Sequence, residues 1–454
     1  MRAMCMSELA GPLAATLLGA DREIRGVTTD SRRVCEGDLF VALCGERFDG
    51  HDYLAQAAAA GAAGALVSRE IETPLTLLEA ADTQAALGRL GAYNRGLYRG
   101  PLVAITGSSG KTTVKNMVRA VLAQRGQTLA TEGNFNNEIG VPLTLLRLAP
   151  EHRFAVVEMG AARAGDIAWL CELGRPTVAL LLNAGSAHLE SFGSVEGVAA
   201  AKGEIFDGLG SDDVAVINAD QSWAGQWRER AAPARVIDFG LQQPAAVSAS
   251  DIRSHGVEGV SFTAHTPAGD IAVRLGLPGV HNVANALAAT AVGLACGLSL
   301  EEIGAGLAQA APVSGRLAVG HTPAGATVVD DCYNANPGSV RAAIDILAGC
   351  DGRRTLLLGA MRELGAESAA LHREVGAYAR SAGIDRLWGV GEELLPSVEA
   401  FGTGGRHFAD RVAAIAALPG AFGRDDTVLV KGSRGSAMEL VLAALLAEPQ
   451  AEEG

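Results

Sequence analysis

Residues 105–113 read ITGSSGKTT, and this stretch decides how the chain folds. It follows an apolar run at residues 102–105 and precedes residues 114–122, which form a plausible helix. Glycines let the backbone wrap so that its N–H groups point inward, and the helix N-terminus adds partial positive charge. The loop therefore predicts phosphate binding. A chance glycine turn is the alternative, and the strand and helix on either side argue against it.

The side chains of this loop suit a nucleoside triphosphate. Lys111 can reach the phosphate that is transferred, and Thr112 offers a hydroxyl to Mg²⁺. Only two residues separate the two glycines, where the commonest phosphate-binding loop has four. We expect ATP or GTP here, although the loop alone does not name a reaction. The residues expected to contact the nucleotide phosphates are Gly107, Ser108, Ser109, Gly110, Lys111, Thr112 and Thr113.

Downstream of the loop, apolar runs alternate with helical stretches. Continuous apolar runs occur at residues 102–105, 154–157, 177–182 and 214–217. Such runs are typical of a mostly parallel sheet that is covered on both faces. Residues 246–277 change to an alternating pattern with turn pairs, which predicts an antiparallel addition at an edge of the sheet.

A further α/β unit is predicted on each side of this sheet. Short β-like runs lie at residues 26–29, 39–43 and 65–68, and later strands are predicted at residues 327–329, 355–358, 386–390 and 427–430. A chain of 454 residues is too long for one ordinary core. We expect an α/β fold of three domains. These are a small N-terminal α/β domain (1–83), a central ATPase domain with a P-loop-type parallel sheet (84–313) and a C-terminal Rossmann-like α/β domain (314–454).

Composition argues against several functional classes. Lys and Arg number 37 against 51 Asp and Glu, a formal net charge of −14, which is unlike a nucleic-acid-binding protein. Seven scattered cysteines without a CxxC pair indicate reduced thiols. The N-terminus lacks the pattern of a signal peptide, and the most apolar stretch, residues 283–298, is too short for a membrane span. We expect a cytoplasmic monomer with no nucleic-acid partner and no membrane insertion.

Three polar residues lie where strands of the central sheet should end, which is the usual ligand edge of such a sheet. Glu158 ends its strand and could hold magnesium. His188 follows the next strand, although a loop histidine more often has a surface or packing role. Lys202, taken alone, is typical of a solvated helical lysine.

The order of these residues after a short glycine loop resembles the Mur ligases and their folylpolyglutamate synthetase relatives. In that superfamily the loop is followed by a strand-end Glu, a His after the next strand, and a carbamylated Lys on the next helix. The resemblance implies ATP and Mg²⁺, with two metal ions expected. The metal-holding residues that it implies are Thr112, Glu158, His188 and carbamylated Lys202. The implied catalytic residues are Lys111, Lys202, His188 and Arg316.

Two other regions resemble the family's nucleotide-closing elements. Residues 278–286, PGVHNVANA, match its adenine-contacting helix start, although Asn282 could simply cap the helix. Residues 314–317, SGRL, and 329–337, VDDCYNANP, match elements of the third domain. A cation there could stabilise the transferring phosphoryl group, and either Asp330 or Asp331 could bind ribose. The implied nucleotide contacts are His281, Asn282, Arg316, Asp331 and Tyr333.

The run DDCYNANP at residues 330–337 separates members of the family. It is close to the run in members that add D-alanyl-D-alanine to UDP-N-acetylmuramoyl-tripeptide, so these two molecules are the implied partners. Residues 358–365 and 430–434 agree, although Ala360 stands where an Asp is usual. Residues 29–32, 48–52 and 133–142 recur in ligases that take UDP-muramoyl-peptides. The implied substrate contacts are Ser31, Arg32, Asn136, Asn137, Asn334, Asn336, Lys431 and Ser433.

The resemblance implies ATP-dependent amide-bond formation through an acyl phosphate. One alternative is a sister enzyme, either a Mur ligase that adds a single amino acid or a folylpolyglutamate synthetase. The Asn-Ala-Asn-Pro run and the uridine-type N-terminal region argue against it. The other alternative is a nucleotide switch or binding module without ligase chemistry, against which Glu158, His188 and Lys202 argue.

Overall fold

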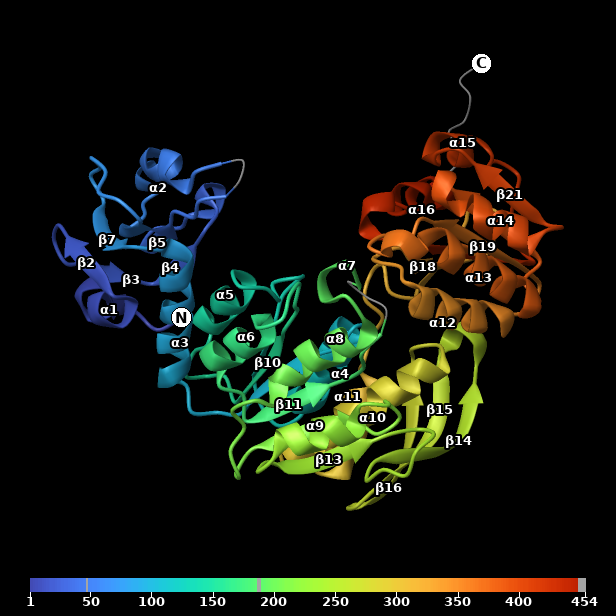
Figure 1. Cartoon of the computed structure of the whole chain (residues 1–454), viewed down its shortest axis with the longest axis horizontal. Helices are drawn as coiled ribbons and strands as arrows, with labels where there is room; N and C mark the ends of the chain where they lie inside the picture. The colour runs from blue at the N-terminus through green and yellow to red at the C-terminus, as the bar shows by residue number, and fades with distance from the viewer. Residues whose placement is uncertain (46–47, 186–188, 448–454) are drawn as a thin grey trace.

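The computed structural model describes residues 1–45, 48–185 and 189–447. Three α/β domains follow one another along the chain, which confirms the predicted fold class. The N-terminal domain, blue in Figure 1, and the C-terminal domain, orange to red, lie at opposite ends of the central domain. The predicted limits of the domains stay predictions.

The central domain is built on six parallel strands in the order β13-β12-β11-β8-β10-β9. Four of them coincide with the predicted apolar runs. The sequence analysis missed the two outer strands, because one has only three residues and the other carries charged residues. The strands are β8 (Leu102–Thr106), β9 (Thr128–Ala130), β10 (Phe154–Glu158), β11 (Val178–Leu181), β12 (Val214–Asn218) and β13 (Arg235–Phe239).

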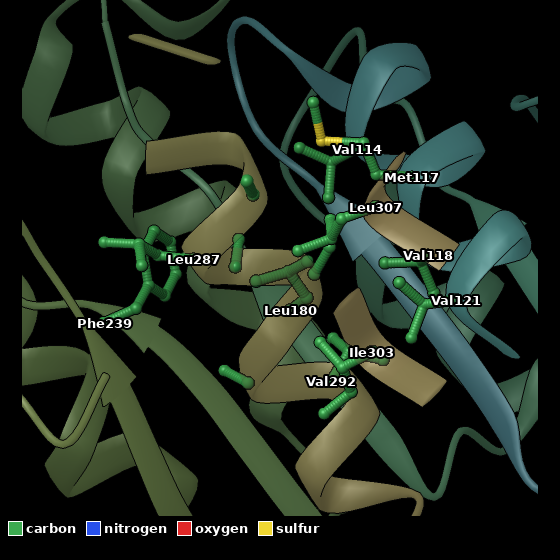
Figure 2. Packing of buried hydrophobic residues seen from close by; sticks show 14 of the residues in the cluster. Val114, Met117, Val118, Val121, Leu180, Phe239, Leu287, Val292, Ile303 and Leu307 are labelled. Carbon is green, nitrogen blue, oxygen red and sulfur yellow. The ribbon is translucent and has the colours of Figure 1, made fainter. Parts of the chain in front are cut away.

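Helix α4 (Lys111–Ala123) fixes the direction of the glycine loop that precedes it. Its apolar side chains recur at helical spacing and face α10 (Val280–Ala295) and α11 (Leu300–Ala308). A Cβ added to Gly306 would lie 2.4 Å from the Cα of Val121, so α11 approaches α4 too closely for any side chain there. Figure 2 shows this packing through Val114, Met117, Val118, Val121, Leu180, Leu287, Val292, Ile303 and Leu307.

The other face of the central sheet is covered by four further helices, whose side chains form a second core with the strands. The sheet is therefore buried on both sides, as its unbroken apolar strands predicted. The helices are α5 (Gly140–Leu146), α6 (Asp166–Gly174), α8 (Val195–Gly203) and α9 (Ala224–Ala231).

The predicted antiparallel addition is a separate sheet, so that part of the prediction was wrong. Strands β14 (Ser248–Ser254), β15 (Val260–Thr266) and β16 (Gly269–Leu275) pair only with one another. An isolated bridge joins Val247, just before β14, to Phe239 at the end of β13. The inward side chains of the three strands join the same core as α10. Burial against that helix holds the sheet, so it does not need a ladder to the edge strand.

The C-terminal domain has six strands in the order β17-β18-β22-β19-β20-β21, parallel except for the first. The four predicted strands appear, and the two outer ones were missed. The strands are β17 (Ala318–His321), β18 (Thr327–Asp331), β19 (Arg353–Gly359), β20 (Arg386–Val390), β21 (Gly405–Phe408) and β22 (Asp426–Lys431). Their two faces are covered by α12 (Pro337–Ala348), α13 (Ser368–Ser381), α14 (Leu395–Phe401), α15 (Arg411–Ala416) and α16 (Glu439–Leu446).

The N-terminal domain contains a five-stranded sheet in the order β2-β7-β6-β5-β4 and a two-stranded sheet of β1 and β3. The three predicted strands appear, and β1, β2, β3 and β7 were missed. The strands are β1 (Met4–Cys5), β2 (Ala15–Leu18), β3 (Glu23–Ile24), β4 (Gly26–Thr28), β5 (Asp38–Val41), β6 (Gly64–Val67) and β7 (Thr76–Ala80). Its helices are α1 (Met6–Leu13) and α2 (Leu54–Ala59), and α3 (Thr83–Leu97) follows its last strand.

Helix α3 ties the first domain to the second. The side-chain amide of Asn94 donates to the carbonyls of Leu145, in the last turn of α5, and Leu148, just beyond it, at 2.8 and 3.0 Å. Arg95 donates from Nε to the Gly174 carbonyl at 2.7 Å. These buried bonds satisfy carbonyls at two helix ends, which would otherwise lack donors.

All seven cysteines are free thiols, in agreement with the prediction. Within the described ranges, no helix combines the length and the apolar character that a membrane span requires.

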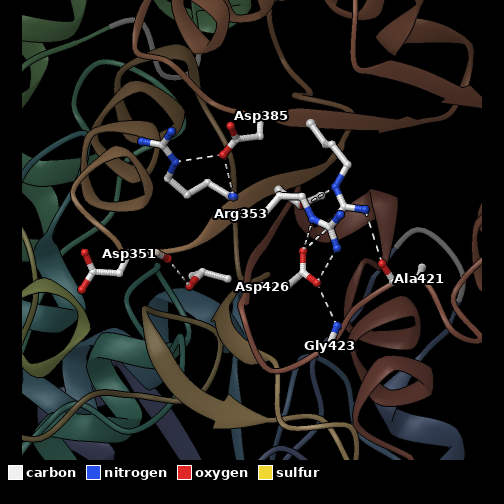
Figure 3. Close-up of polar contacts among 10 residues, drawn as sticks. Asp351, Arg353, Asp385, Ala421, Gly423 and Asp426 are labelled. Carbon is white, nitrogen blue, oxygen red and sulfur yellow. Dashed lines mark hydrogen bonds and ion pairs between the residues drawn. The ribbon is translucent and has the colours of Figure 1, made fainter.

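The buried carboxylate of Asp426 joins the first residues of three strands in the C-terminal domain. Asp426 is 3% exposed and accepts two hydrogen bonds from Arg353, at 2.7 and 2.8 Å, and one from the backbone N–H of Gly423 at 2.8 Å. Arg386 forms a second ion pair with it. Figure 3 shows Asp426 together with Arg353 and Gly423. The hydrogen bonds from Arg353 lower the pKa of Asp426, although burial acts in the opposite direction.

We expect Asp426→Ala to lower the free energy of unfolding of the C-terminal domain by about 3 kcal/mol, because two arginines lose their shared partner. Amide hydrogen exchange in denaturant resolves this domain from the others. Since the folded pKa lies below the unfolded value of about 4, the wild-type contribution is present above that pH and is lost as pH falls through the folded pKa. The exposed neighbour gives a control, since Asp425→Asn should change stability by less than about 0.5 kcal/mol. Equal losses in both variants would contradict the role of the buried carboxylate.

Candidate active site

A cavity of about 1680 Å³ lies between the central and C-terminal domains, where the carboxyl ends of both parallel sheets meet. Its lining includes most of the residues that the sequence singled out. Those residues are Ser108, Ser109, Gly110, Lys111, Thr112, Thr113, Asn136, Asn137, Glu158, Lys202, His281, Asn282, Arg316, Asp331, Tyr333, Asn334, Asn336, Lys431 and Ser433.

Hydrogen bonds from the loop to the segment after the neighbouring strand β11 fix the conformation of the glycine loop. Asn183 follows β11 and accepts hydrogen bonds from the backbone N–H of Ser109 at its side chain, 2.9 Å, and from that of Ser108 at its carbonyl, 3.0 Å. Gly110 has φ +81°, and a Cβ there would lie 3.0 Å from Oδ1 of Asn285. Gly107 is absent from the residues that line the cavity in the described structure. The sequence analysis did not assign a role to Asn183, because a loop asparagine gives no local signal of what it contacts.

Glu158 is the carboxylate at the end of β10, and it is 2% exposed. Its two oxygens accept hydrogen bonds from Oγ1 of Thr112 and Nδ2 of Asn136, both at 2.8 Å. The ammonium of Lys111 donates to the Gly107 carbonyl at 2.6 Å, and burial lowers its pKa. Hydroxyl and carboxylate oxygens in direct contact form a donor set that suits Mg²⁺.

Lys202 is not the solvated lysine that its helix alone suggested. It is 2% exposed on α8, and it lines the cavity. Burial, reinforced by the charge of Lys111, lowers the pKa of Lys202 to about 7. Within the part of the chain that the structure describes, no residue accepts a hydrogen bond from its amine. A large share of this amine is therefore neutral at neutral pH. His188 lies outside the described residues.

The start of α10 forms the opposite side of the cavity. Asn282 is 2% exposed, and its amide donates to the Pro278 carbonyl at 2.7 Å and accepts from Asn285 at 2.9 Å. It does not cap the helix, because α10 follows Gly279 and has no side-chain cap. Burial lowers the pKa of His281 to about 4, so its imidazole is neutral at neutral pH. The contact of Asn282 with the base stays a prediction, since its amide is already bonded within the protein.

The two adjacent aspartates after β18 differ in what they contact. Asp330 accepts hydrogen bonds from the backbone N–H groups of Gly315, at 2.7 Å, and Cys332, at 3.2 Å. Asp331 lines the cavity and forms an ion pair with Lys431, its partner in the register of β18 and β22. Asp330 therefore shapes the turn, and Asp331 is the one placed to meet a ligand.

Arg316 follows the turn that Asp330 holds. Its guanidinium lies over the ring of Tyr333, 4.3 Å from the centroid, and both residues line the cavity. Stacking on an aromatic face orients a guanidinium while leaving its N–H groups available.

Asn336 connects the third domain to the glycine loop. Its side chain caps α12 by accepting from Ser339, and its Nδ2 donates to Oγ of Ser109 at 3.3 Å. This hydrogen bond joins two residues that are 227 positions apart and belong to different domains, and it holds the N-terminus of α12 next to the phosphate loop.

The remaining predicted residues of the third domain order their own loops. Lys431 donates to the Asn334 carbonyl at 3.0 Å, besides its pair with Asp331. The N–H of Ser433 donates to the Ala360 carbonyl at 3.0 Å, and its hydroxyl accepts from the N–H of Arg362 at 2.8 Å. Ala360 is buried and contributes its carbonyl to this network.

Ser31 and Arg32 are not brought to this cavity. They lie in the N-terminal domain, and neither of them lines the cavity. Ser31 donates to Oε1 of Gln56 at 3.0 Å, and Arg32 forms an exposed ion pair with Asp30 at 2.8 Å. Of the other substrate candidates, Asn137 accepts from the N–H of Gly140 at 2.9 Å and so orders the loop before α5.

The sequence analysis also missed Lys115. It is buried, lines the cavity and donates to the Thr131 carbonyl at 2.7 Å. Its position four residues after Lys111 places both on one face of α4, which is a signal that could have found it.

Comparison with known proteins gives three consecutive family matches. Residues 23–87 match the model of the Mur ligase family catalytic domain, 105–293 the Mur ligase middle domain, and 315–434 the Mur ligase glutamate ligase domain. A UDP-N-acetylmuramoyl-tripeptide–D-alanyl-D-alanine ligase of Escherichia coli (strain K12) is 47% identical over 98% of this chain and 99% of that relative. The ligase of the same name from Haemophilus influenzae is 41% identical over 96% of this chain and 97% of that relative.

Solved structures agree with these matches. A crystal structure of MurF from Acinetobacter baumannii has a TM-score of 0.93 and 36% identity, covering 99% of this chain and 100% of that one. A MurF ligase from Thermotoga maritima in complex with ADP has a TM-score of 0.81 and 29% identity, covering 93% and 97%. The chain belongs to the Mur ligase family.

Proposed function

We propose that this chain joins D-alanyl-D-alanine to UDP-N-acetylmuramoyl-tripeptide in an ATP-dependent reaction of peptidoglycan precursor synthesis. The observation that carries the proposal is the single cavity in which the phosphate loop and Glu158 face Arg316 and Asp331 of the third domain. Relatives that bear the name of this ligase match nearly the whole chain at 41–47% identity, and one structural neighbour binds ADP.

ATP is needed because a carboxylate oxygen is a poor leaving group. Transfer of the γ-phosphoryl group to the tripeptide carboxylate gives an acyl phosphate, which has phosphate as its leaving group. The amine of D-alanyl-D-alanine then attacks the acyl carbon, and the tetrahedral intermediate collapses to amide and phosphate. Lys111 and the N–H groups of the glycine loop offset the negative charge of the phosphates, and Arg316 can contact the transferring group.

The donor set around Glu158 fits magnesium. Thr112 and Glu158 supply oxygen ligands in contact with each other. When bound, Mg²⁺ would reduce the repulsion between the γ-phosphate and the carboxylate that attacks it. The ammonium form of Lys202 would repel a cation, whereas its carbamate would be anionic. Carbamylation of Lys202, a second metal ion and a ligand role for His188 belong to this proposal.

Closure of the third domain protects the acyl phosphate from water. The hydrogen bond from Asn336 to Ser109 and the cavity-facing Arg316 come from the domain that would move.

We also propose that the enzyme acts as a monomer in the cytoplasm and that residues 1–83, 84–313 and 314–454 are its domains. Ser31 and Arg32 then hold the uridine diphosphate end of the substrate.

We expect Lys111→Met to lower kcat for ligation by at least about 100-fold, because the phosphoryl group loses a charge that stabilises its transfer. Coupled measurement of ADP release in the presence of both substrates checks this. Methionine keeps the length of the side chain and the start of α4, so circular dichroism should match the wild type. Near-normal turnover in this variant would refute the role of Lys111.

Oxygen-18 placed in the terminal carboxyl group of the tripeptide should appear in the inorganic phosphate that is released. The label moves because the carboxylate oxygen becomes the bridge of the acyl phosphate and leaves with phosphorus. Mass spectrometry of the phosphate gives the answer. Ligation without transfer of label would rule out the acyl phosphate.

We expect ¹³C-bicarbonate to label Lys202 as a carbamate, seen by ¹³C NMR, at constant dissolved CO₂. Labelling should rise as pH increases through about 7, because only the neutral amine reacts and its pKa is about 7. Lys202→Arg should give no such signal and should lose ligation. Lys202→Ala should regain part of its activity with added acetate, which can replace the missing carboxylate group. Full wild-type activity without CO₂ and without signal would exclude the carbamate.

A further inference from the structure

Lys115 is a buried cation that the reaction described above does not use. It lies on α4 four residues beyond Lys111, about 6 Å farther along the helix axis. Its side chain is 4% exposed and lines the cavity. The ammonium donates to the Thr131 carbonyl at 2.7 Å, and the hydroxyl of Thr131 in turn accepts from the N–H of Glu158 at 3.0 Å. Lys115 therefore sits beside the carboxylate edge of the site.

Among the described residues, no carboxylate forms an ion pair with this ammonium, whose hydrogen-bond partner is the Thr131 carbonyl. The nearby Glu158 is bonded to Thr112 and Asn136, and Glu132 forms an ion pair with Arg147 at 2.7 Å. An ammonium has three N–H donors, and Thr131 accepts only one of them. Burial lowers the pKa of Lys115, and the attraction of Glu158 opposes that shift only in part. A buried charge with unused donors favours an anionic ligand.

The position of Lys115 separates it from the nucleotide phosphates. Those phosphates belong at the glycine loop and the N-terminus of α4, where Lys111 lies. Lys115 instead adjoins Thr131 and the loop that carries Asn136, on the side of the cavity formed by the end of β9. An acid that approaches the γ-phosphate from this side would bring its carboxylate to the ammonium.

We propose that Lys115 binds the carboxylate of the acyl substrate that is to be phosphorylated. The inference rests on the proposed function and adds a residue to it. By neutralising the acid, Lys115 lets two anionic reactants approach each other, and it acts on the acid rather than on ATP or on the incoming dipeptide. A merely structural lysine that ties Thr131 to α4 would instead affect stability, or all three substrates alike.

Steady-state kinetics of the full-length enzyme separate these roles. We expect Lys115→Met to raise KM for UDP-N-acetylmuramoyl-tripeptide at least about tenfold, while KM for ATP and for D-alanyl-D-alanine stays within about twofold. Lys115→Arg should restore much of the loss because it keeps the charge. Arg253→Met, an exposed substitution on β14, controls for the loss of a positive charge.

The pH profile gives a second readout that does not need the methionine variant to fold. In the wild type, kcat/KM for UDP-N-acetylmuramoyl-tripeptide should fall at high pH as Lys115 loses its proton. In Lys115→Arg this fall should occur at a higher pH, because arginine keeps its proton. The inference is overturned if KM for the tripeptide is unchanged, if KM for ATP rises equally, or if the arginine profile coincides with the wild type. If the wild-type protein does not join D-alanyl-D-alanine to the tripeptide at all, the proposed function itself is contradicted.

Discussion

Crowding of basic side chains near the phosphate loop is the constraint on which this site depends. Burial lowers the pKa of Lys111, Lys115 and Lys202, so each amine holds its proton less firmly than it would in water. Buried basic groups gathered at one site favour ligands or a modification that supply negative charge. The overall charge of −14 repels anions, so the attraction for polyanionic substrates has to be local.

The fold was predictable where strands are buried on both faces. The runs that became β8, β10, β11 and β12 are uninterrupted apolar segments, and their carboxyl ends meet at one edge in register, with Glu158 beside Ile105. The outer strands have a weaker hydrophobic pattern in the sequence, because one edge of each is exposed to water and their side chains are partly polar. The separate sheet β14–β16 could not be told from an edge addition, since both have the same alternating pattern.

The site was predictable as far as chain order and strand ends allow. Nothing in the local sequence distinguishes Asp330 from Asp331. The structure separates them, because Asp330 accepts hydrogen bonds from the backbone N–H groups of Gly315 and Cys332. Burial of Lys202 depends on helices packed from elsewhere in the chain, so its helix alone suggested a solvated residue. Asn183 likewise acquires its role through a partner 74 positions away.

The pairing of Asp331 with Lys431 limits how β22 can change in length. The two residues are opposite each other in parallel strands, and successive side chains in a strand point to opposite faces. One residue inserted before Lys431 would turn its ammonium to the far side of the sheet and place a different side chain beside the aspartate. An insertion or deletion within the strand that delivers this lysine would therefore separate the pair.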